Sequence, residues 1–117
     1  MDTSQIIIEN EQRMIRVVLE ELLYITTVRN QDHVLQFITK NKTYYSRGIL
    51  KNYINKNYPT LFRCHRSTIV NLQAIREINK TEKKIYFIND EKNCHFSKRK
   101  GASLSIQWKK LLLHNQK

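Results

Sequence analysis

Short apolar, β-branched or aromatic runs alternate with turn-forming residues along most of this chain. Eight runs of four to ten residues recur at nearly regular spacing, which is typical of an antiparallel β domain. Because the chain contains only two Gly and one Pro, we expect clusters with Asn to form the hairpin tips at 40–42, 79–81 and 89–91. The predicted strands are 5–9, 14–19, 22–27, 33–39, 61–70, 75–78, 84–88 and 93–96.

Two segments depart from the strand pattern, because their apolar residues recur at helical spacing. The first spans 48–58 and ends before Pro59, and the second spans 102–114. We therefore predict a mainly β fold with one short helix in mid-chain and a C-terminal helix. A helix-turn-helix requires two consecutive helices. A long stretch of strand pattern separates these two, so nucleic acid would be read by strands and loops.

Composition limits the class of protein. The 117 residues suit one compact domain, and 40% hydrophobic with 26% charged residues is typical of a soluble globular chain. No apolar run is long enough to span a membrane, and no basic segment followed by an apolar one begins the chain as in a secretory signal. Two cysteines are too few for a disulfide scaffold, so we expect a cytoplasmic protein.

Charge is the most informative part of the composition. The chain has 21 Lys and Arg against 10 Asp and Glu, a net charge of +11. Residues 1–21 hold five acids and two bases, so residues 22–117 carry +14. A domain this positive repels itself unless a polyanion lies against it. Nucleic acid is the first candidate partner and an anionic membrane the second, while a basic surface without a partner is the simplest alternative.

Three polar clusters could form a nucleic-acid interface. They are Arg63-Cys64-His65-Arg66-Ser67-Thr68-Ile69-Val70-Asn71, Ser97-Lys98-Arg99-Lys100-Gly101 and Arg29-Asn30-Gln31-Asp32-His33. Arginine can bond both major-groove acceptors of guanine, and Asn or Gln can do the same for adenine. Each cluster alone is most simply a solvated loop. Three such clusters on so basic a chain favour an interface.

The order of the motifs resembles that of the LytTR DNA-binding domain from about Gln5 to about Leu104. The strings that carry the resemblance are "Leu-Leu-Tyr-Ile", "Leu-Phe-Arg-Cys-His-Arg-Ser-Thr-Ile-Val-Asn", "Ile-Arg-Glu-Ile", "Lys-Ile-Tyr-Phe" and "Cys-His-Phe-Ser-Lys-Arg". The chain is most similar to output domains of accessory-gene-regulator and competence-type response regulators of Gram-positive bacteria. The resemblance implies elongated antiparallel β-sheets with loops that enter successive major grooves of duplex DNA.

The resemblance also implies roles for individual residues. Base contacts fall on His33, with Asn30 or Gln31 as alternatives, on Arg66, and on Arg99. Some relatives have Asn or Lys in place of Arg66, so the preferred base can differ here. Contacts to the DNA backbone are expected from Arg29, Ser67, Ser97, Lys98 and Lys100.

The function implied is that of a sequence-specific transcription regulator on promoter direct repeats, filled by two copies of the protein, in quorum-sensing or peptide-signalled control. We expect no enzyme activity, no cofactor and no membrane partner, and the residues do not indicate a contact with RNA polymerase. The 117 residues hold no counterpart of a receiver domain. We therefore expect a single DNA-binding domain, either an excised output domain or a free-standing regulator. The helical tail at 105–117 would be a cap or a dimer contact.

The two Cys-His dipeptides allow three interpretations. Zinc is the weakest, because adjacent strand residues face opposite sides and cannot easily chelate one tetrahedral ion. Burial of Cys64 and Cys94 as small apolar residues is the simplest. A third is a redox pair, with a disulfide between two strands predicted to be neighbours, whose closure would displace Arg66 and Arg99 and weaken DNA binding.

Two other functions stay open at this stage. Four histidines are compatible with a nuclease, but paired carboxylates, metal-ligand spacing and a nucleophile with its base are all missing from the sequence. A β-sheet protein that binds single-stranded nucleic acid or RNA is the stronger alternative, since aromatic side chains can stack on bases. Most of the aromatic residues lie in apolar runs, and only Tyr44 and Tyr45 are expected to be exposed.

Overall fold

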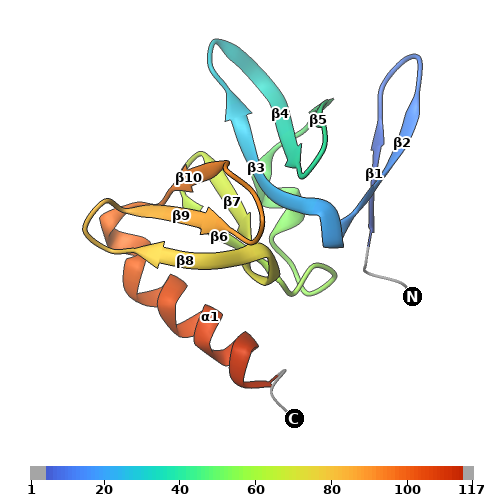
Figure 1. Ribbon diagram of the computed structural model, residues 1–117. Coiled ribbons are helices and arrows are strands. Elements are labelled where there is room, and N and C mark those ends of the chain that lie inside the picture. Colours follow the sequence, from blue (N-terminus) through green and yellow to red (C-terminus); the bar gives the residue numbers. More distant parts are fainter. Residues whose placement is uncertain (1–4, 115–117) are drawn as a thin grey trace.

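The protein folds into three antiparallel β-sheets and a C-terminal helix (Figure 1). The computed structural model describes residues 5–114. A hairpin of β1 and β2 stands beside a five-stranded sheet of order β5-β4-β3-β7-β6, and a third sheet has the order β10-β9-β8. The strands are β1 Gln5–Glu9, β2 Met14–Val18, β3 Leu22–Val28, β4 Gln31–Thr39, β5 Thr43–Arg47, β6 Leu61–His65, β7 Thr68–Asn71, β8 Ile75–Asn79, β9 Lys84–Phe87 and β10 Asn93–His95.

The described residues contain one α-helix, α1 (Gly101–His114), which confirms the predicted C-terminal helix. Four 3₁₀ helices join the strands: η1 Leu19–Glu21, η2 Leu50–Tyr53, η3 Leu72–Ala74 and η4 Lys98–Lys100. The helix predicted over 48–58 is reduced to η2. Asn55 explains the early end, because its side-chain oxygen accepts a hydrogen bond from the backbone N–H of Asn57 (2.9 Å) and its amide donates to the carbonyl of Asn52 (3.0 Å). Such local bonds compete with helical ones.

The strand predictions are confirmed with two corrections. The run predicted over 61–70 is two strands, β6 and β7, which pair through a turn at Arg66-Ser67. The strand β5 was not predicted, although Tyr44 and Ser46 turn inward and Tyr45 and Arg47 outward in the alternation of a half-buried strand. The three predicted Asn tips all lie between paired strands.

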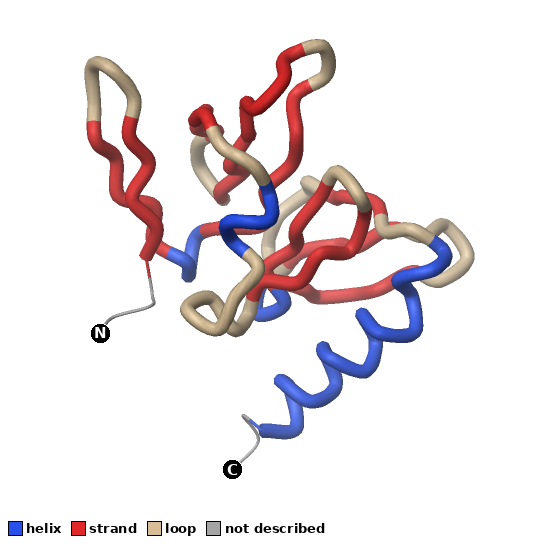
Figure 2. The backbone as a smooth tube through the Cα atoms, turned by 180° about the vertical axis from the view of Figure 1, so that it is seen from behind, coloured by secondary structure: helices blue, strands red, loops and turns tan. Residues whose placement is uncertain are grey.

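Other elements pack on part of each face of the five-stranded sheet, and Figures 1 and 2 show the β1–β2 hairpin to one side of it and the three-stranded sheet with α1 to the other. One face packs on the three-stranded sheet and α1 in what we name the helix-side core, and the other packs on the β1–β2 hairpin and η2 in the hairpin-side core. The helix-side core contains Leu23, Ile38, Cys64, Val70, Leu72, Ala74, Ile75, Ile85, Phe87, Cys94, Phe96 and Leu104. The hairpin-side core contains Ile6, Ile8, Val17, Leu19, Leu22, Ile25, Leu35, Phe37, Leu50, Leu61 and Ile69.

Asn71, which ends β7, has a structural role. Its side chain is completely buried, and its amide nitrogen donates hydrogen bonds to the carbonyl oxygens of Leu19 (2.8 Å) and Leu22 (2.9 Å). A buried amide left without partners would cost free energy, so these bonds fix the chain around η1 to the sheet. The last residue of the "Ile-Val-Asn" string therefore holds the fold together at a distance from Arg66.

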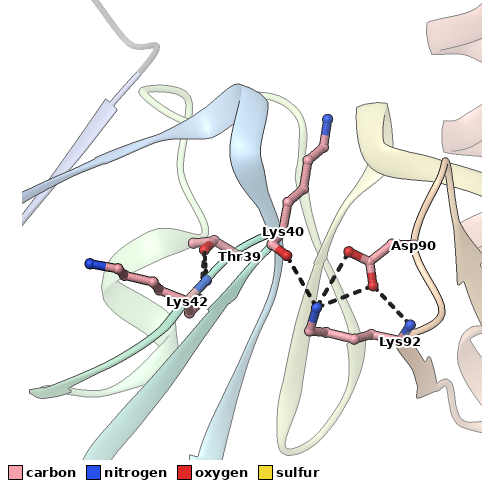
Figure 3. Close-up of polar contacts among 5 residues, drawn as sticks. All are labelled: Thr39, Lys40, Lys42, Asp90 and Lys92. Atoms are coloured by element: carbon pink, nitrogen blue, oxygen red, sulfur yellow. Dashed lines mark hydrogen bonds and ion pairs between the residues drawn. The ribbon is translucent and has the colours of Figure 1, made fainter.

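A lysine joins two of the sheets at the surface (Figure 3). Lys92, between β9 and β10, donates through Nζ to the carbonyl oxygen of Lys40 (3.3 Å) and pairs with the Asp90 carboxylate (3.2 Å). Lys40 lies in the β4–β5 turn, which Thr39 closes through its Oγ1 hydrogen bond to the carbonyl of Lys42 (2.7 Å). The contact connects the three-stranded sheet to the end of β4.

No helix of the described residues is long and apolar enough to cross a membrane.

Candidate nucleic-acid interface

The β6–β7 turn presents Arg66 on a braced backbone. The guanidinium of Arg63 donates to the Arg66 carbonyl oxygen, and the carbonyl of Ser67 accepts hydrogen bonds from Thr26 Oγ1 (3.0 Å) and the backbone N–H of Thr27 (3.0 Å). Both flanking peptide groups are thus fixed by neighbouring strands, while the Arg66 side chain is exposed. The sequence placed Arg66 near the end of a strand, and the structure places it in a tight turn.

The connection between β10 and α1 presents Arg99. Ser97 precedes η4, and its backbone N–H donates to the Cys64 carbonyl (2.9 Å), while its own carbonyl accepts from the N–H of Lys100 (3.0 Å). Gly101 follows this turn and lies close to Phe96, since a Cβ at position 101 would lie 3.3 Å from the ring and the ring would have to shift by a few tenths of an ångström. The chain therefore turns sharply over Phe96 and leaves Arg99 exposed on a short helical turn.

Arg66 and Arg99 line the same surface hollow. Its volume is about 450 Å³, and its other lining residues are Arg63, His65, Ser97 and Lys100. The lining thus contains four cationic side chains and no carboxylate. In the described part of the chain, ion pairs form between Arg76 and Glu77 and between Lys92 and Asp90, and neither involves this hollow. Its cations are available to an anionic partner.

His33, the third predicted base contact, lies at a backbone irregularity next to this hollow. Val28 pairs with Gln31 and Thr27 with Leu35, so residues 32–34 form a bulge in β4. His33 has φ = 59° and its carbonyl accepts a 2.8 Å hydrogen bond from the N–H of Gly48. A left-handed backbone is uncommon for residues other than glycine, and His is among those that adopt it most readily. Its side chain is exposed beside a hollow of about 400 Å³.

Arg63 connects the two hollows, since it lines both of them. Its contact with the Arg66 carbonyl could not be inferred before the turn was known. Arg29 and Asn30 form the exposed β3–β4 turn beside His33, and Asn30 also has a positive φ of 64°. The three predicted base-reading positions lie in turns, a bulge or a short 3₁₀ helix, whereas the strand pattern had placed His33 and Arg66 within strands.

The four other predicted backbone contacts occupy different environments. The Ser67 hydroxyl lies 2.9 Å from His65 Nδ1 and already has a partner within the protein, while the Ser97 hydroxyl makes no capping hydrogen bond to η4. Lys100 lines the arginine hollow. Lys98 lies instead in a separate hollow of about 280 Å³, with Lys80 and Lys83 from the β8–β9 turn. Those two lysines were not predicted, because it is the pairing of β9 with β10, continued by the hydrogen bond from the Phe96 N–H to the Lys83 carbonyl (3.1 Å), that brings their turn close to Lys98.

Cys64 and Cys94 are both free thiols buried in the helix-side core. The strands β6 and β10 belong to different sheets, so the two thiols meet across the core between the sheets rather than along one sheet, and the redox pair stays a prediction. The hydrogen bond with Cys64, followed by burial, raises the pKa of the Cys94 thiol. Within residues 5–114, no three His, Cys, Asp or Glu side chains gather into a group that could hold a metal.

Comparisons with known proteins agree with this geometry. No curated protein sequence matches the chain. A LytTr DNA-binding domain of a response regulator from Bacillus cereus has a similar structure, with a TM-score of 0.68 over 89% of this chain and 95% of that chain, at 19% sequence identity, which shows a shared fold. The family model of the LytTr DNA-binding domain matches residues 12–109. With most of its length matched in this way, the chain belongs to the LytTr DNA-binding domain family.

Proposed function

We propose that this domain reads the base sequence of duplex DNA with Arg66, Arg99 and His33, and so regulates transcription from promoters. The observation that supports the proposal is the shared hollow of Arg66 and Arg99, which come from two separate connections but lie on one cationic surface. Two guanidinium groups side by side can contact neighbouring base pairs in one major groove. The bulge at His33 supplies a second reading position close by.

Arginine suits this role because its planar fork bonds the O6 and N7 atoms of guanine together. The braced β6–β7 turn limits the conformations of Arg66 before DNA arrives, and less ordering on binding favours affinity. Arg29, Ser97, Lys98 and Lys100 surround these residues and would contact phosphates, which position a protein on DNA without reading sequence. Ser67 can join them only if its hydroxyl leaves His65 or accepts a second hydrogen bond.

We further infer the biological setting that the family resemblance implies. Two copies would bind direct repeats in a promoter, in the cytoplasm of a cell that responds to a secreted peptide. An elongated module gains contact area when DNA curves toward it, so bending of the site is expected. The principal extents of 40 × 34 × 26 Å are sufficient for one molecule to reach more than one turn of groove.

Binding to single strands or RNA through stacked bases is the weaker alternative. Such binding needs several exposed aromatic rings. Tyr45 is 51% exposed and bonds Gln36 through its hydroxyl (2.8 Å), but Tyr44 packs against the hairpin-side core, so the predicted pair of exposed tyrosines is reduced to one. Tyr24 stacks on Phe87 in the other core at a centroid distance of 5.7 Å.

The test is a selection from a random duplex library, followed by titration of the enriched duplex, a scrambled duplex and matched single strands of DNA and RNA. We expect one enriched motif that the protein binds more tightly than every other probe. R76A is a matched control, since Arg76 is an exposed arginine paired with Glu77 away from the arginine hollow. Preference for single strands, or failure to enrich a motif, would refute the proposal.

A further inference from the structure

His65 holds the turn that carries Arg66 through two contacts at one ring nitrogen. The backbone N–H of Ser67 donates to His65 Nδ1 (3.1 Å), and the Ser67 hydroxyl lies 2.9 Å from the same nitrogen. The imidazole of His65 and the following Ser67 are thus joined to each other across Arg66, which lies between them in the sequence. The side-chain hydroxyls of Thr68 and Thr26 continue the polar contacts from Ser67 into the sheet, at 3.4 Å and 3.3 Å.

These contacts determine which form of the imidazole the turn requires. A backbone N–H can only donate, so His65 Nδ1 must carry its lone pair and the neutral ring must carry its proton on Nε2. A protonated imidazole has a donor at both nitrogens and offers no acceptor. The N–H of Ser67 would then face another N–H, and the brace on the Arg66 turn would be lost.

The surroundings of His65 are cationic. Arg63 and Arg66 flank it on its own hairpin, and Arg99 and Lys100 face it from η4. Tyr24 from β3 and Cys94 and His95 from β10 line its other side, together with the polar Thr26, Ser67, Thr68 and Asn93. No carboxylate of the described residues lines either hollow, so the ring has no anionic partner among residues 5–114. Ser67 is the group that holds it in place.

We propose that His65 is a positioning residue for base reading, and that its neutral form latches the turn so that Arg66 points at its base. The proposal rests on the proposed function, since it assigns the accuracy of Arg66 to a neighbour that need not contact DNA. Loss of the Nδ1 acceptor would free the turn and weaken discrimination at the base position that Arg66 reads.

Two variants separate positioning from other roles. H65A removes the acceptor. H65N retains an acceptor, since asparagine Oδ1 occupies the place of histidine Nδ1, but it does not titrate. Selections from one random duplex library are run in parallel with the unmodified protein and with H65A, H65N, R66A and R99A. The base positions lost in R66A and those lost in R99A then define the part of the motif that each arginine reads.

We expect H65A to lose preference by about three- to tenfold at the Arg66 positions, the size of one lost hydrogen bond, and to keep it at the Arg99 positions. H65N retains both. Uniform loss on every duplex would mean a phosphate contact, and unchanged preference or equal loss at both sets of positions would overturn the latch.

A measurement on the free protein makes the outcome independent of DNA. Long-range ¹H–¹⁵N spectra distinguish the two ring nitrogens, and we expect an unprotonated Nδ1 at neutral pH together with a hydrogen-bonded Ser67 amide. A proton on Nδ1 would refute the latch even where DNA binding is confirmed. If no duplex motif is enriched by the unmodified protein, the proposed function fails instead. Circular dichroism verifies that every variant is folded.

Discussion

The backbone N–H of Ser97 donates a 2.9 Å hydrogen bond to the carbonyl oxygen of Cys64. Cys64 lies two residues before Arg66, and Ser97 lies two residues before Arg99. The bond therefore joins the two chain segments that deliver the arginines, although they belong to different sheets and lie more than thirty residues apart in sequence. This link fixes the backbone segments that carry the two arginines relative to each other.

Removal of either arginine should affect sequence preference and not only affinity. R66A and R99A are each expected to cost about 1–3 kcal/mol on the selected duplex, and each should relax a different part of the motif. Titration of single-base variants of the duplex measures this. The control R76A should bind as the unmodified protein does, and a uniform loss across all duplexes would contradict base reading.

Salt should weaken binding strongly. If about five to eight phosphates are neutralised, log K falls with log[salt] at a slope of roughly −5 to −7. K98A should reduce the magnitude of this slope by about one and weaken all duplexes alike, because Lys98 lies outside the arginine hollow. A shallow slope in the unmodified protein would argue against phosphate contacts as the main source of affinity.

Oxidation should weaken DNA binding through Cys64 and Cys94. In a disulfide each thiol loses a proton, and the two electrons pass to an added thiol oxidant such as diamide. The new S–S bond is shorter than the present contact between thiols, so Cys64 moves toward Cys94 and the braced turn at Arg66 shifts. Titration of oxidised and reduced protein against the same duplex measures the effect.

The variants C64S and C94S should bind DNA equally before and after treatment with diamide, since neither can form the bond. Identical binding by the oxidised and reduced forms of the unmodified protein would refute the redox pair. Mass spectrometry of the unreduced protein shows whether the bond has formed, which separates an inert disulfide from an unreactive pair.

Stability should fall at alkaline pH because of Cys94. Its pKa is raised in the folded protein, whereas a cysteine in the unfolded chain ionises near pH 8.5. Below that pH both states hold the proton and there is no effect. Above it the unfolded chain releases a proton that the folded protein retains, so the free energy of unfolding decreases by about 1.4 kcal/mol per pH unit for this group.

Urea titrations from about pH 8 to about pH 9.5 test this below the range in which tyrosine ionises. The upper pH limit is needed because burial also raises the pKa of Tyr24, so the ionisation of tyrosine would add its own effect on stability at higher pH. The variant C94S should show a decline with pH that is shallower by about one proton. An equal decline in C94S and the unmodified protein would contradict the assignment.

Two substitutions of His33 should affect the free energy of unfolding and the binding of DNA differently. His33 has φ = 59°, which glycine adopts without strain and β-branched residues strongly disfavour. H33G is expected to keep the free energy of unfolding within about 1 kcal/mol and to weaken binding to the selected duplex. H33V should unfold at lower denaturant concentration. Chemical denaturation and duplex titration of both variants measure the two effects, and full binding by H33G would remove His33 from the interface.

The strand pattern predicted most of the fold because apolar side chains in this chain follow the period of the elements they form. Ile6 and Ile8 in β1, like Ile85 and Phe87 in β9, lie two positions apart and are both buried, as the alternation of side chains along a strand requires. Failures occurred where local polar bonds decided the outcome. Asn55 ends a helix that the spacing of Leu50 and Tyr53 favours, and no periodic signal reports such a bond.

The candidate site was predictable by residue type and position but not by contact. Arg66 and Arg99 could be singled out from the charged strings in which they lie. Their meeting in one hollow depends on how two sheets pack, which one sequence does not specify. The same holds for Lys80 and Lys83 beside Lys98, and for His65, whose function comes from the geometry of a single turn.

The buried apolar side chains of the five-stranded sheet lie in two layers, one on each face, while the ends of its strands and part of β5, including Tyr45, are open to solvent. Arg66 and Ser67 lie in a turn outside those layers, so substitutions there leave the buried apolar contacts in place. Substitutions at such exposed positions can therefore accumulate at little cost to folding. This separation is consistent with a chain that keeps a TM-score of 0.68 to a relative with which it shares 19% of its residues.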